Sequence, residues 1–323
     1  MKYTFESAFE PYIVGLINQK RSDGFIYVSG EYHLKKFDQF CVSFFPSVKS
    51  ITQEIASKWA NIRETEGEHY RNRRVGALRQ LSLYMLSLGY EAYVPRNINN
   101  GPKPVLYIPS RVEMSAFFAE LDSWECRDHC GKRTVIEYRV IFRLYYCCGL
   151  RLSEARLLKK EDVDFDKGIL TILRSKGNKD RLVYLPSDGT QILADYLLNI
   201  EALLPNSPWL FPGQDAKKPL HGSVIWRRFK DCWSRLPFAV NAYKSPTVHC
   251  LRHAFVVERM NDWMRQGLNT QELLPYLSKH LGHKSPSETF YYYHLVLNAF
   301  AVIREKDSVS GRVIPGVYDY EEI

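Results

Sequence analysis

The sequence lacks the features that mark membrane, secreted and repetitive proteins. No run of 18 apolar residues occurs in the 323-residue chain, so the sequence predicts no membrane-spanning helix. The opening residues, MKYTFESAFEPY, contain acidic side chains and no apolar core, which argues against a signal peptide. No internal repeat and no low-complexity tract is present. We therefore expect a folded cytoplasmic protein with no membrane partner.

Cysteine occurs in an odd number, seven, which argues against a disulfide framework. Cys147 and Cys148 are adjacent in an apolar run, as buried free thiols are, and a reducing compartment fits them. Cys126, His129 and Cys130 form the motif CRDHC, but no fourth ligand and no second cluster follows at zinc-finger spacing. We expect no metal site there.

Motifs for nucleotides and catalytic metals are also missing. The sequence has no P-loop, no Gly-rich phosphate cradle and no acidic metal cluster. Asp162, Asp164 and Asp166 alternate as DVDFD, a pattern that a metal-dependent nuclease could use. The run leads into a β-rich segment at Ile169, so an ordinary loop is the better interpretation. The sequence therefore predicts neither a metal nor a cofactor.

Positive charge is in excess. The formal net charge is +8 and the pI is about 9.0, a balance that suits a polyanion partner. One basic segment is HYRNRRVGALRQ, the first half of a helix predicted over residues 68–88, whose second half is almost all apolar. This division predicts one buried end and one end that contacts a phosphate backbone. The candidate DNA-binding residues are Arg71, Arg73, Arg74 and Arg79.

Apolar residues at helical spacing dominate the rest of the chain, so we expect a mainly α fold with a small β-sheet. Four N-terminal helices are predicted over residues 1–92, the third opened by a capping box of Ser50 and Gln53. Residues 93–109 are rich in proline and glycine and predict a linker. Residues 110–323 form a second domain, where Ser110 and Glu113 make another capping box and strands at 169–173 and 182–185 flank a turn.

Six residues of the second domain could carry chemistry together. Each alone is typical of a surface side chain or a packing contact, but their order and spacing are informative. They are Arg151 in GLRLSE, Lys176 in SKGNKDR, His249 and Arg252 in HCLRHAF, His283 in LGHKS and Tyr292 in ETFYYYH.

The segments that contain these residues resemble the signature boxes of the tyrosine recombinases, which include the phage integrases and the Xer proteins. They are GLRLSEARLL, SKGNKDRLVYLP, HCLRHAF and LGHKSPSETFYYYH. More loosely, NRRVGALRQLSLYML resembles the last helix of the family's core-binding domain. The resemblance implies a four-helix, SAM-like core-binding domain at 1–92 and an α+β catalytic domain with a C-terminal tail at 110–323.

The resemblance also implies a role for each residue. Arg151 and Arg252 would hold the non-bridging phosphate oxygens, since a guanidinium matches them bidentately. His283 would donate a further hydrogen bond to the phosphate. Tyr292 would be the nucleophile, because it stands nine residues after His283 and two before His294, as the family's tyrosine does.

Three further residues would move or support protons. Lys176, on the turn between the strands, would be the general acid for the DNA 5′-oxygen. His249 would share proton transfer near the tyrosine. Glu154, one helical turn after Arg151, would hold a catalytic side chain in place.

The implied function is site-specific recombination of double-stranded DNA by a homotetramer through a 3′-phosphotyrosine intermediate, for integration or excision of a mobile element. At 323 residues a recombinase of simple sites fits best. Alternatives are chromosome or plasmid dimer resolution, type IB topoisomerase-like relaxation and a catalytically inactive DNA-binding regulator. The nucleoid is the expected location.

Overall fold

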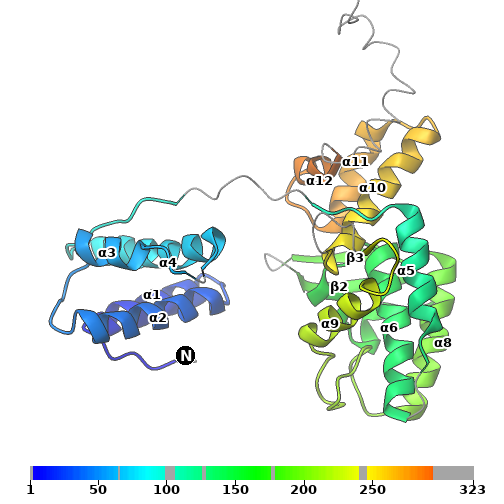
Figure 1. Ribbon diagram of the computed structural model, residues 1–323, viewed down its shortest axis with the longest axis horizontal. Helices are drawn as coiled ribbons and strands as arrows, with labels where there is room; N and C mark the ends of the chain where they lie inside the picture. The colour runs from blue at the N-terminus through cyan, green and yellow to red at the C-terminus, as the bar shows by residue number, and fades with distance from the viewer. Residues whose placement is uncertain are drawn as a thin grey trace, which may run out of the picture. The chain divides into compact units, whose positions relative to one another are not determined.

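The computed structural model describes residues 3–64, 66–98, 106–125, 129–175, 179–239 and 246–293. The chain forms two compact units, Met1–Pro104 and Val105–Ile323 (Figure 1). Their boundary falls inside the predicted linker, whose described residues, 93–98 and 106–109, are neither helix nor strand. No helix among the described residues has the length and apolarity needed to cross a membrane.

The first unit is built from four helices: α1 (Glu10–Ser22), α2 (Val28–Phe44), α3 (Gln53–Ala60) and α4 (Glu68–Ser87). Their apolar faces meet in one core, in which Phe9, Phe37 and Trp59 are almost fully buried. The predicted capping box at Ser50 is wrong. Thr52 caps α3 instead, because its hydroxyl accepts a hydrogen bond from the backbone N–H of Ile55.

The second unit contains eight α-helices and a small sheet in its described part. The capping box of Ser110 and Glu113 is confirmed at the start of the first helix. The helices are α5 (Arg111–Ser123), α6 (His129–Cys147), α7 (Leu152–Arg156), α8 (Ser187–Leu203), α9 (Gly222–Trp233), α10 (His249–Arg265), α11 (Thr270–Leu281) and α12 (Pro286–Tyr293), with a 3₁₀ turn at Lys160–Asp162.

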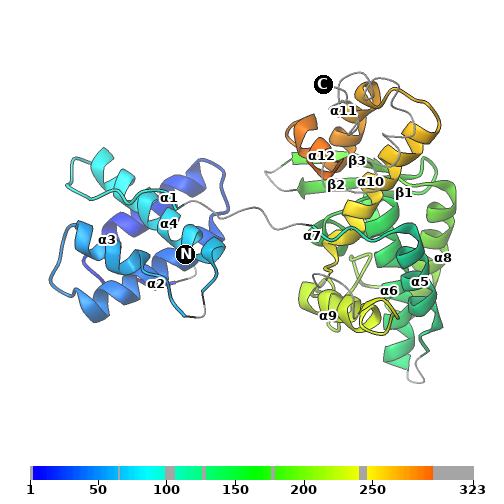
Figure 2. The same cartoon turned by 45° about the horizontal axis from the view of Figure 1, so that its top comes forward.

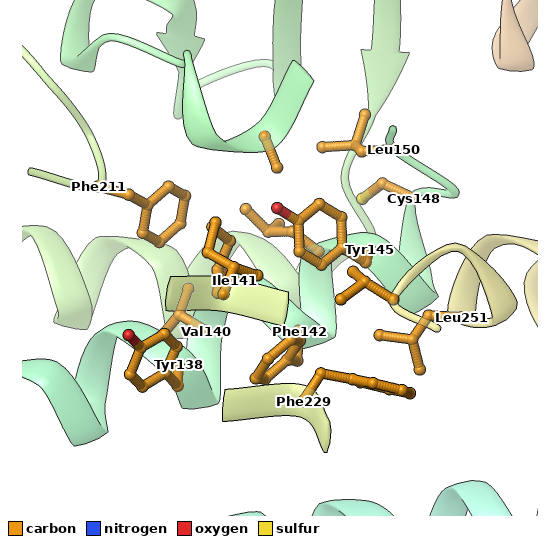
Figure 3. Close-up of a cluster of buried hydrophobic side chains, with 14 of the residues drawn as sticks. Tyr138, Val140, Ile141, Phe142, Tyr145, Cys148, Leu150, Phe211, Phe229 and Leu251 are labelled. Carbon is orange, nitrogen blue, oxygen red and sulfur yellow. The ribbon is translucent and has the colours of Figure 1, made fainter. Parts of the chain in front are cut away.

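Helix α6 lies at the centre of this unit. It packs against α5, α7, α8 and α10, and α6 and α8 run side by side in both ribbon views (Figures 1 and 2). Its buried face meets side chains from other elements, as Figure 3 shows for Phe142, Tyr145, Phe229 and Leu251. This aromatic-rich core holds α7, α10 and the sheet in position, and these elements carry the polar residues of the site.

The sheet has three antiparallel strands in the order β1-β2-β3. Strands β2 (Ile169–Ser175) and β3 (Lys179–Tyr184) form the predicted pair, with Ile169 opposite Tyr184. Strand β1 (Val163–Asp164) comes from the DVDFD run, so the expectation of an ordinary loop there is wrong for these two residues. Asp164 accepts a hydrogen bond from the N–H of Lys167, which closes the β1–β2 turn.

Candidate active site

Two glycines with left-handed backbone bring separate segments together. Gly149 (φ +60°) follows α6, and a β-carbon there would lie 2.6 Å from a ring carbon of Phe255. Gly282 (φ +66°) ends α11. Both conformations suit glycine because it has no Cβ. The resulting turns offer their carbonyl groups to arginines: Gly149 accepts from Arg252, and Gly282 accepts from Arg151.

Glu154 is the anionic centre of the site. Its side chain is 3% exposed and its oxygens accept hydrogen bonds from Arg151 (2.8 Å), Ser175 (2.6 Å) and both terminal nitrogens of Arg181 (2.8 and 2.9 Å). Burial alone would raise the pKa of Glu154, but the bonds and charge of Arg181, with those of Ser175 and the Arg151 backbone, hold it well below its usual range. Glu154 is therefore ionised and supports two guanidinium groups.

Arg252 is the most deeply buried cation of the site. It is 1% exposed, and it donates to the carbonyl groups of Gly149 (2.6 Å) and Leu281 (2.7 Å). Burial and the nearby Arg151 charge lower the pKa of Arg252 to about 10, so it stays protonated at neutral pH. Its buried Nε has no hydrogen-bond partner within the described part of the chain. A buried donor without a partner is costly, so this nitrogen can donate to an anion that reaches it.

His283 lies between Arg252 and helix α12. Its Nε2 is 3.0 Å from a terminal nitrogen of Arg252, and its Nδ1 is 2.7 Å from the hydroxyl of Thr289. A guanidinium can only donate, so Nε2 accepts and the ring hydrogen is on Nδ1. Burial, with the charges of Arg252, Arg151 and Arg181, lowers the pKa of His283 to about 3, which agrees with a neutral ring.

Tyr292 faces the same cluster from α12, which packs on α10 and α11 (Figure 2). Its ring centroid is 4.7 Å from that of His253 and 6.0 Å from that of His283. Burial raises the pKa of Tyr292, while the charges of Arg252 and Arg151 oppose that rise. Its neighbour Tyr291 contacts Tyr292 edge-on, at 6.3 Å between ring centroids.

Two histidines of α10 complete this side of the site. His249 begins the helix, and its ring meets that of His253 edge-on at 4.5 Å. His253 therefore lies between His249 and Tyr292 in a row of aromatic contacts. Burial, together with the neighbouring His249 and Arg252, lowers the pKa of His253 to about 3, so this ring is also neutral.

The structure brings together five of the six sequence-predicted residues, namely Arg151, His249, Arg252, His283 and Tyr292, and Glu154 with them. Lys176 lies outside the described residues, although Ser175, which precedes it, bonds to Glu154. Residues 126–128 of the motif CRDHC and the tail after residue 293 also lie outside what is described, and His129 and Cys130 are described only as the first residues of α6. Elsewhere, the described residues contain no cluster of metal-ligating side chains.

The arginines of the predicted basic helix α4 differ in their exposure to solvent. Arg73 is exposed, whereas Arg71 and Arg79 are half-buried and donate to the carbonyl groups of Ala60 and Pro95. Arg74 is 1% exposed and forms an ion pair with buried Glu66. The prediction that Arg74 contacts DNA is therefore wrong, because its guanidinium is enclosed in the helix bundle.

Sequence reasoning missed four members of the site. Arg181 and Ser175 bind Glu154, Thr289 binds His283, and His253 contacts the Tyr292 ring. Arg181 stands within the segment SKGNKDR and His253 within HCLRHAF, so both were inside segments already singled out. Ser175 and Thr289 also stand within the segments SKGNKDR and ETFYYYH, but neither carried a signal of its own, because a lone hydroxyl has many uses.

The arrangement can hold and polarise an anion. Three guanidinium groups, those of Arg151, Arg181 and Arg252, surround one carboxylate, so the cluster carries excess positive charge. The tyrosine, Tyr292, lies on the neighbouring helix α12. Positioned cations of this kind stabilise negative charge that develops on a reacting oxygen. A phosphoryl group next to a nucleophilic tyrosine fits these residues.

Comparisons with known proteins give a family match for the second unit. Residues 118–298, more than half of the chain, match the model of the phage integrase family. The tyrosine recombinase XerD of Brucella suis biovar 1 is 27% identical over 278 residues, which cover 79% of this chain and 86% of that protein.

Solved structures show the same fold. XerH site-specific recombinase bound to palindromic difH substrate superposes with a TM-score of 0.64 at 21% identity, over 86% of this chain and 79% of that one. The Tn1549 transposon integrase in complex with a circular intermediate DNA gives a TM-score of 0.63 at 15% identity, over 91% of this chain and 98% of that one.

Proposed function

Because this chain belongs to the phage integrase family of tyrosine recombinases, we propose that it cleaves and rejoins DNA through a covalent 3′-phosphotyrosine intermediate on Tyr292. The observation that carries the proposal is one cluster: ionised Glu154 contacts Arg151 and Arg252, Arg252 contacts His283, and His283 contacts the ring of Tyr292. The unpartnered Nε of Arg252 supports an oxygen ligand at this point.

The first step is attack of the Tyr292 hydroxyl on the DNA phosphorus. The bond from phosphorus to the tyrosine oxygen forms, and the bond to the DNA 5′-oxygen breaks. Arg151 and Arg252 neutralise the charge that grows on the non-bridging oxygens. Burial raises the pKa of Tyr292, so the phenol must lose its proton during attack rather than before it. His249 is proposed to share that proton transfer, and its ring contacts His253, which contacts the ring of Tyr292.

The leaving 5′-oxygen needs a proton, and Lys176 is proposed to supply it. Lys176 directly follows Ser175, whose hydroxyl bonds to Glu154 and Arg151. The step keeps the number of phosphodiester bonds constant, since one P–O bond replaces another. The reverse reaction onto a new 5′-hydroxyl therefore needs no ATP. No step calls for a metal or a cofactor.

The proposed substrate is a pair of double-stranded DNA sites bound by a homotetramer. The XerH and Tn1549 integrase neighbours are both complexes with DNA, which supports a DNA substrate for this fold. Integration or excision of a mobile element is the proposed role, and the Tn1549 likeness supports it. Dimer resolution is the second candidate. The relative named tyrosine recombinase XerD favours it, because that name places the relative in the Xer group.

The test is a suicide DNA substrate that carries a nick near the cleavage position and traps the covalent intermediate. We expect a protein–DNA adduct from the natural chain and from Tyr291→Phe and Tyr293→Phe, but none from Tyr292→Phe. Loss of the hydroxyl alone should leave folding and DNA binding intact. An adduct that persists in Tyr292→Phe and disappears in a neighbour would show that another tyrosine is the nucleophile.

Products distinguish the alternative functions. Joint molecules from two sites identify a recombinase, whereas supercoil relaxation without joint molecules identifies a topoisomerase-like activity. DNA binding without any adduct identifies a regulator and contradicts the proposal.

A further inference from the structure

A hydrogen-bonded row connects Arg252, His283 and Thr289. Arg252 donates to Nε2 of His283 at 3.0 Å, so the ring hydrogen is on Nδ1 and is donated to Thr289 at 2.7 Å. Thr289 is fully buried on α12, three residues before Tyr292 and therefore on the same side of that helix. The row joins the cation cluster to the helix that carries the tyrosine.

This arrangement is unsuited to a phosphate ligand without a change at His283. A phosphate oxygen accepts hydrogen bonds, but Nε2 has no hydrogen to give while it accepts from Arg252. The ring can become a donor at Nε2 in two ways. It can bind a second proton and become charged, or it can move its hydrogen from Nδ1 to Nε2 and stay neutral.

The surroundings favour the neutral route. Arg151, Arg181 and Arg252 all lie close enough to oppose a positive charge on the ring, and burial opposes it further. The neutral route has its own requirement, because Nδ1 becomes a buried acceptor once its hydrogen has gone. A buried acceptor without a donor is costly, so the group next to Nδ1 must be able to donate as well as accept.

We propose that Thr289 is a positioning residue that allows His283 to exchange tautomers when a DNA phosphate binds, an inference that rests on the proposed function. Its hydroxyl accepts from Nδ1–H in the free protein and donates to Nδ1 in the complex. A hydroxyl is both donor and acceptor, so rotation about one bond is sufficient. Solvent water takes the hydrogen from Nδ1 and supplies one to Nε2, so the ring's charge and number of protons do not change.

The location of Thr289 gives the exchange a further consequence. The residue belongs to α12, so the hydroxyl reaches Nδ1 only when this helix is seated against His283 and Arg252. His283 thus becomes a donor to phosphate only while Tyr292 is in place to attack. Thr289 touches neither the phosphate nor the reacting atoms, and it acts through His283.

The first test uses ¹⁵N NMR of the full chain with ¹⁵N-labelled histidine. Free protein should show His283 protonated at Nδ1. Tyr292→Phe bound to an uncleaved DNA site should show the same ring protonated at Nε2. Retention of the Nδ1 hydrogen in the DNA complex, or a doubly protonated ring there, would overturn the inference. This measurement needs no change at Thr289, so it holds even where a variant folds poorly.

The second test compares Thr289→Val, which keeps the shape, with Thr289→Ser, which keeps the hydroxyl. Single-turnover adduct formation should fall roughly 10- to 100-fold in Thr289→Val, because Nδ1 loses its partner. DNA affinity should stay within about twofold, and Thr289→Ser should restore the rate. Equal rates in all three proteins would overturn the role of Thr289 alone. Absence of any adduct from the natural chain would overturn the proposed function, and the inference with it.

Discussion

Arg73 and Arg74 are neighbours in the sequence, yet the structure gives them opposite environments. Arg73 is exposed on α4, whereas Arg74 is enclosed and paired with Glu66. The guanidinium of Arg74 also lies over the ring of Trp59, 5.0 Å from its centroid. The Arg74 pair lowers the pKa of Glu66, first through the side-chain hydrogen bond. Two residues of one basic segment therefore serve different purposes: Arg73 can contact a phosphate, and Arg74 stabilises the fold.

Alanine substitution should separate the two purposes. Arg73→Ala should weaken DNA binding similarly across sequences and reduce the slope of log affinity against log salt by about 1, with stability unchanged. Arg74→Ala leaves Glu66 buried without its partner and should lower the free energy of unfolding by about 3–5 kcal/mol. Salt titrations of DNA binding and urea denaturation measure these effects. A stable Arg74→Ala that loses DNA affinity would contradict the assignment.

The sequence predicted which residues would gather at the site but not how they would be held. The boxes of Arg151, Arg252, His283 and Tyr292 are recognisable because their order and spacing are informative together. The bonds of Glu154 to Ser175 and Arg181 join residues 21 and 27 positions away, and no local pattern reports such pairs. The burial of Arg74 was equally invisible, since a helical basic segment has the same letters in either environment.

At the scale of elements, α6 carries an unusual group in its buried face. Glu137 is fully buried, neither carboxyl oxygen has a hydrogen-bond partner in the described part of the chain, and Arg133 lies 3.9 Å away. Burial raises the pKa of Glu137 to about 8, although the Arg133 charge opposes the rise. The folded protein therefore binds a proton there that the unfolded chain, with an ordinary value of 4.5, has released at neutral pH.

This difference sets the sign of a pH dependence. Between about pH 4.5 and 8 the folded state binds more protons than the unfolded state, so stability falls as pH rises, by up to about 1.4 kcal/mol per pH unit. Glu137→Gln should remove this slope, and its advantage over the natural chain should grow towards pH 8. Urea denaturation at several pH values measures it, with exposed Glu125→Gln as the control. An unchanged slope in Glu137→Gln would show that the carboxyl is not protonated in the fold.

Elements with strong patterns were predicted well, and short ones were not. The apolar run of α6 and the capping box of α5 act locally, so the sequence alone predicts them. Strand β1 has two residues and exists because Val163 and Asp164 pair with β2, which is a tertiary effect. Helix α3 begins after Thr52 rather than Ser50 because a cap depends on backbone geometry that several hydroxyl residues can satisfy.

At the scale of the whole molecule, the second unit has an apolar groove beside the site. The groove encloses about 680 Å³ between β3, α10 and α11, and Trp263 and Phe255 help to line it. Tyr276 and Tyr184 also line it and are 74% and 65% exposed. Exposed aromatic side chains around a cavity are typical of a surface that another segment covers. The apolar segment Leu295–Ile303 has a suitable composition, and we expect it to dock on a neighbouring copy in the proposed DNA-bound tetramer.

Two truncations should test this assembly. Removal of residues 306–323, which end in the acidic YDYEEI, keeps the apolar segment and should leave synapsis of two DNA sites intact, whereas removal of 295–323 should abolish it. Binding to a single site should survive in both. Docking on a neighbour predicts that the melting temperature of the free monomer is the same after either truncation, because the monomer gains nothing from the segment. Docking within one chain would instead lower the melting temperature once 295–303 is lost, since the groove would be uncovered. Melting curves of the monomer, with gel-shift assays of paired sites, therefore show whether residues 295–303 dock on a neighbouring subunit or on their own chain.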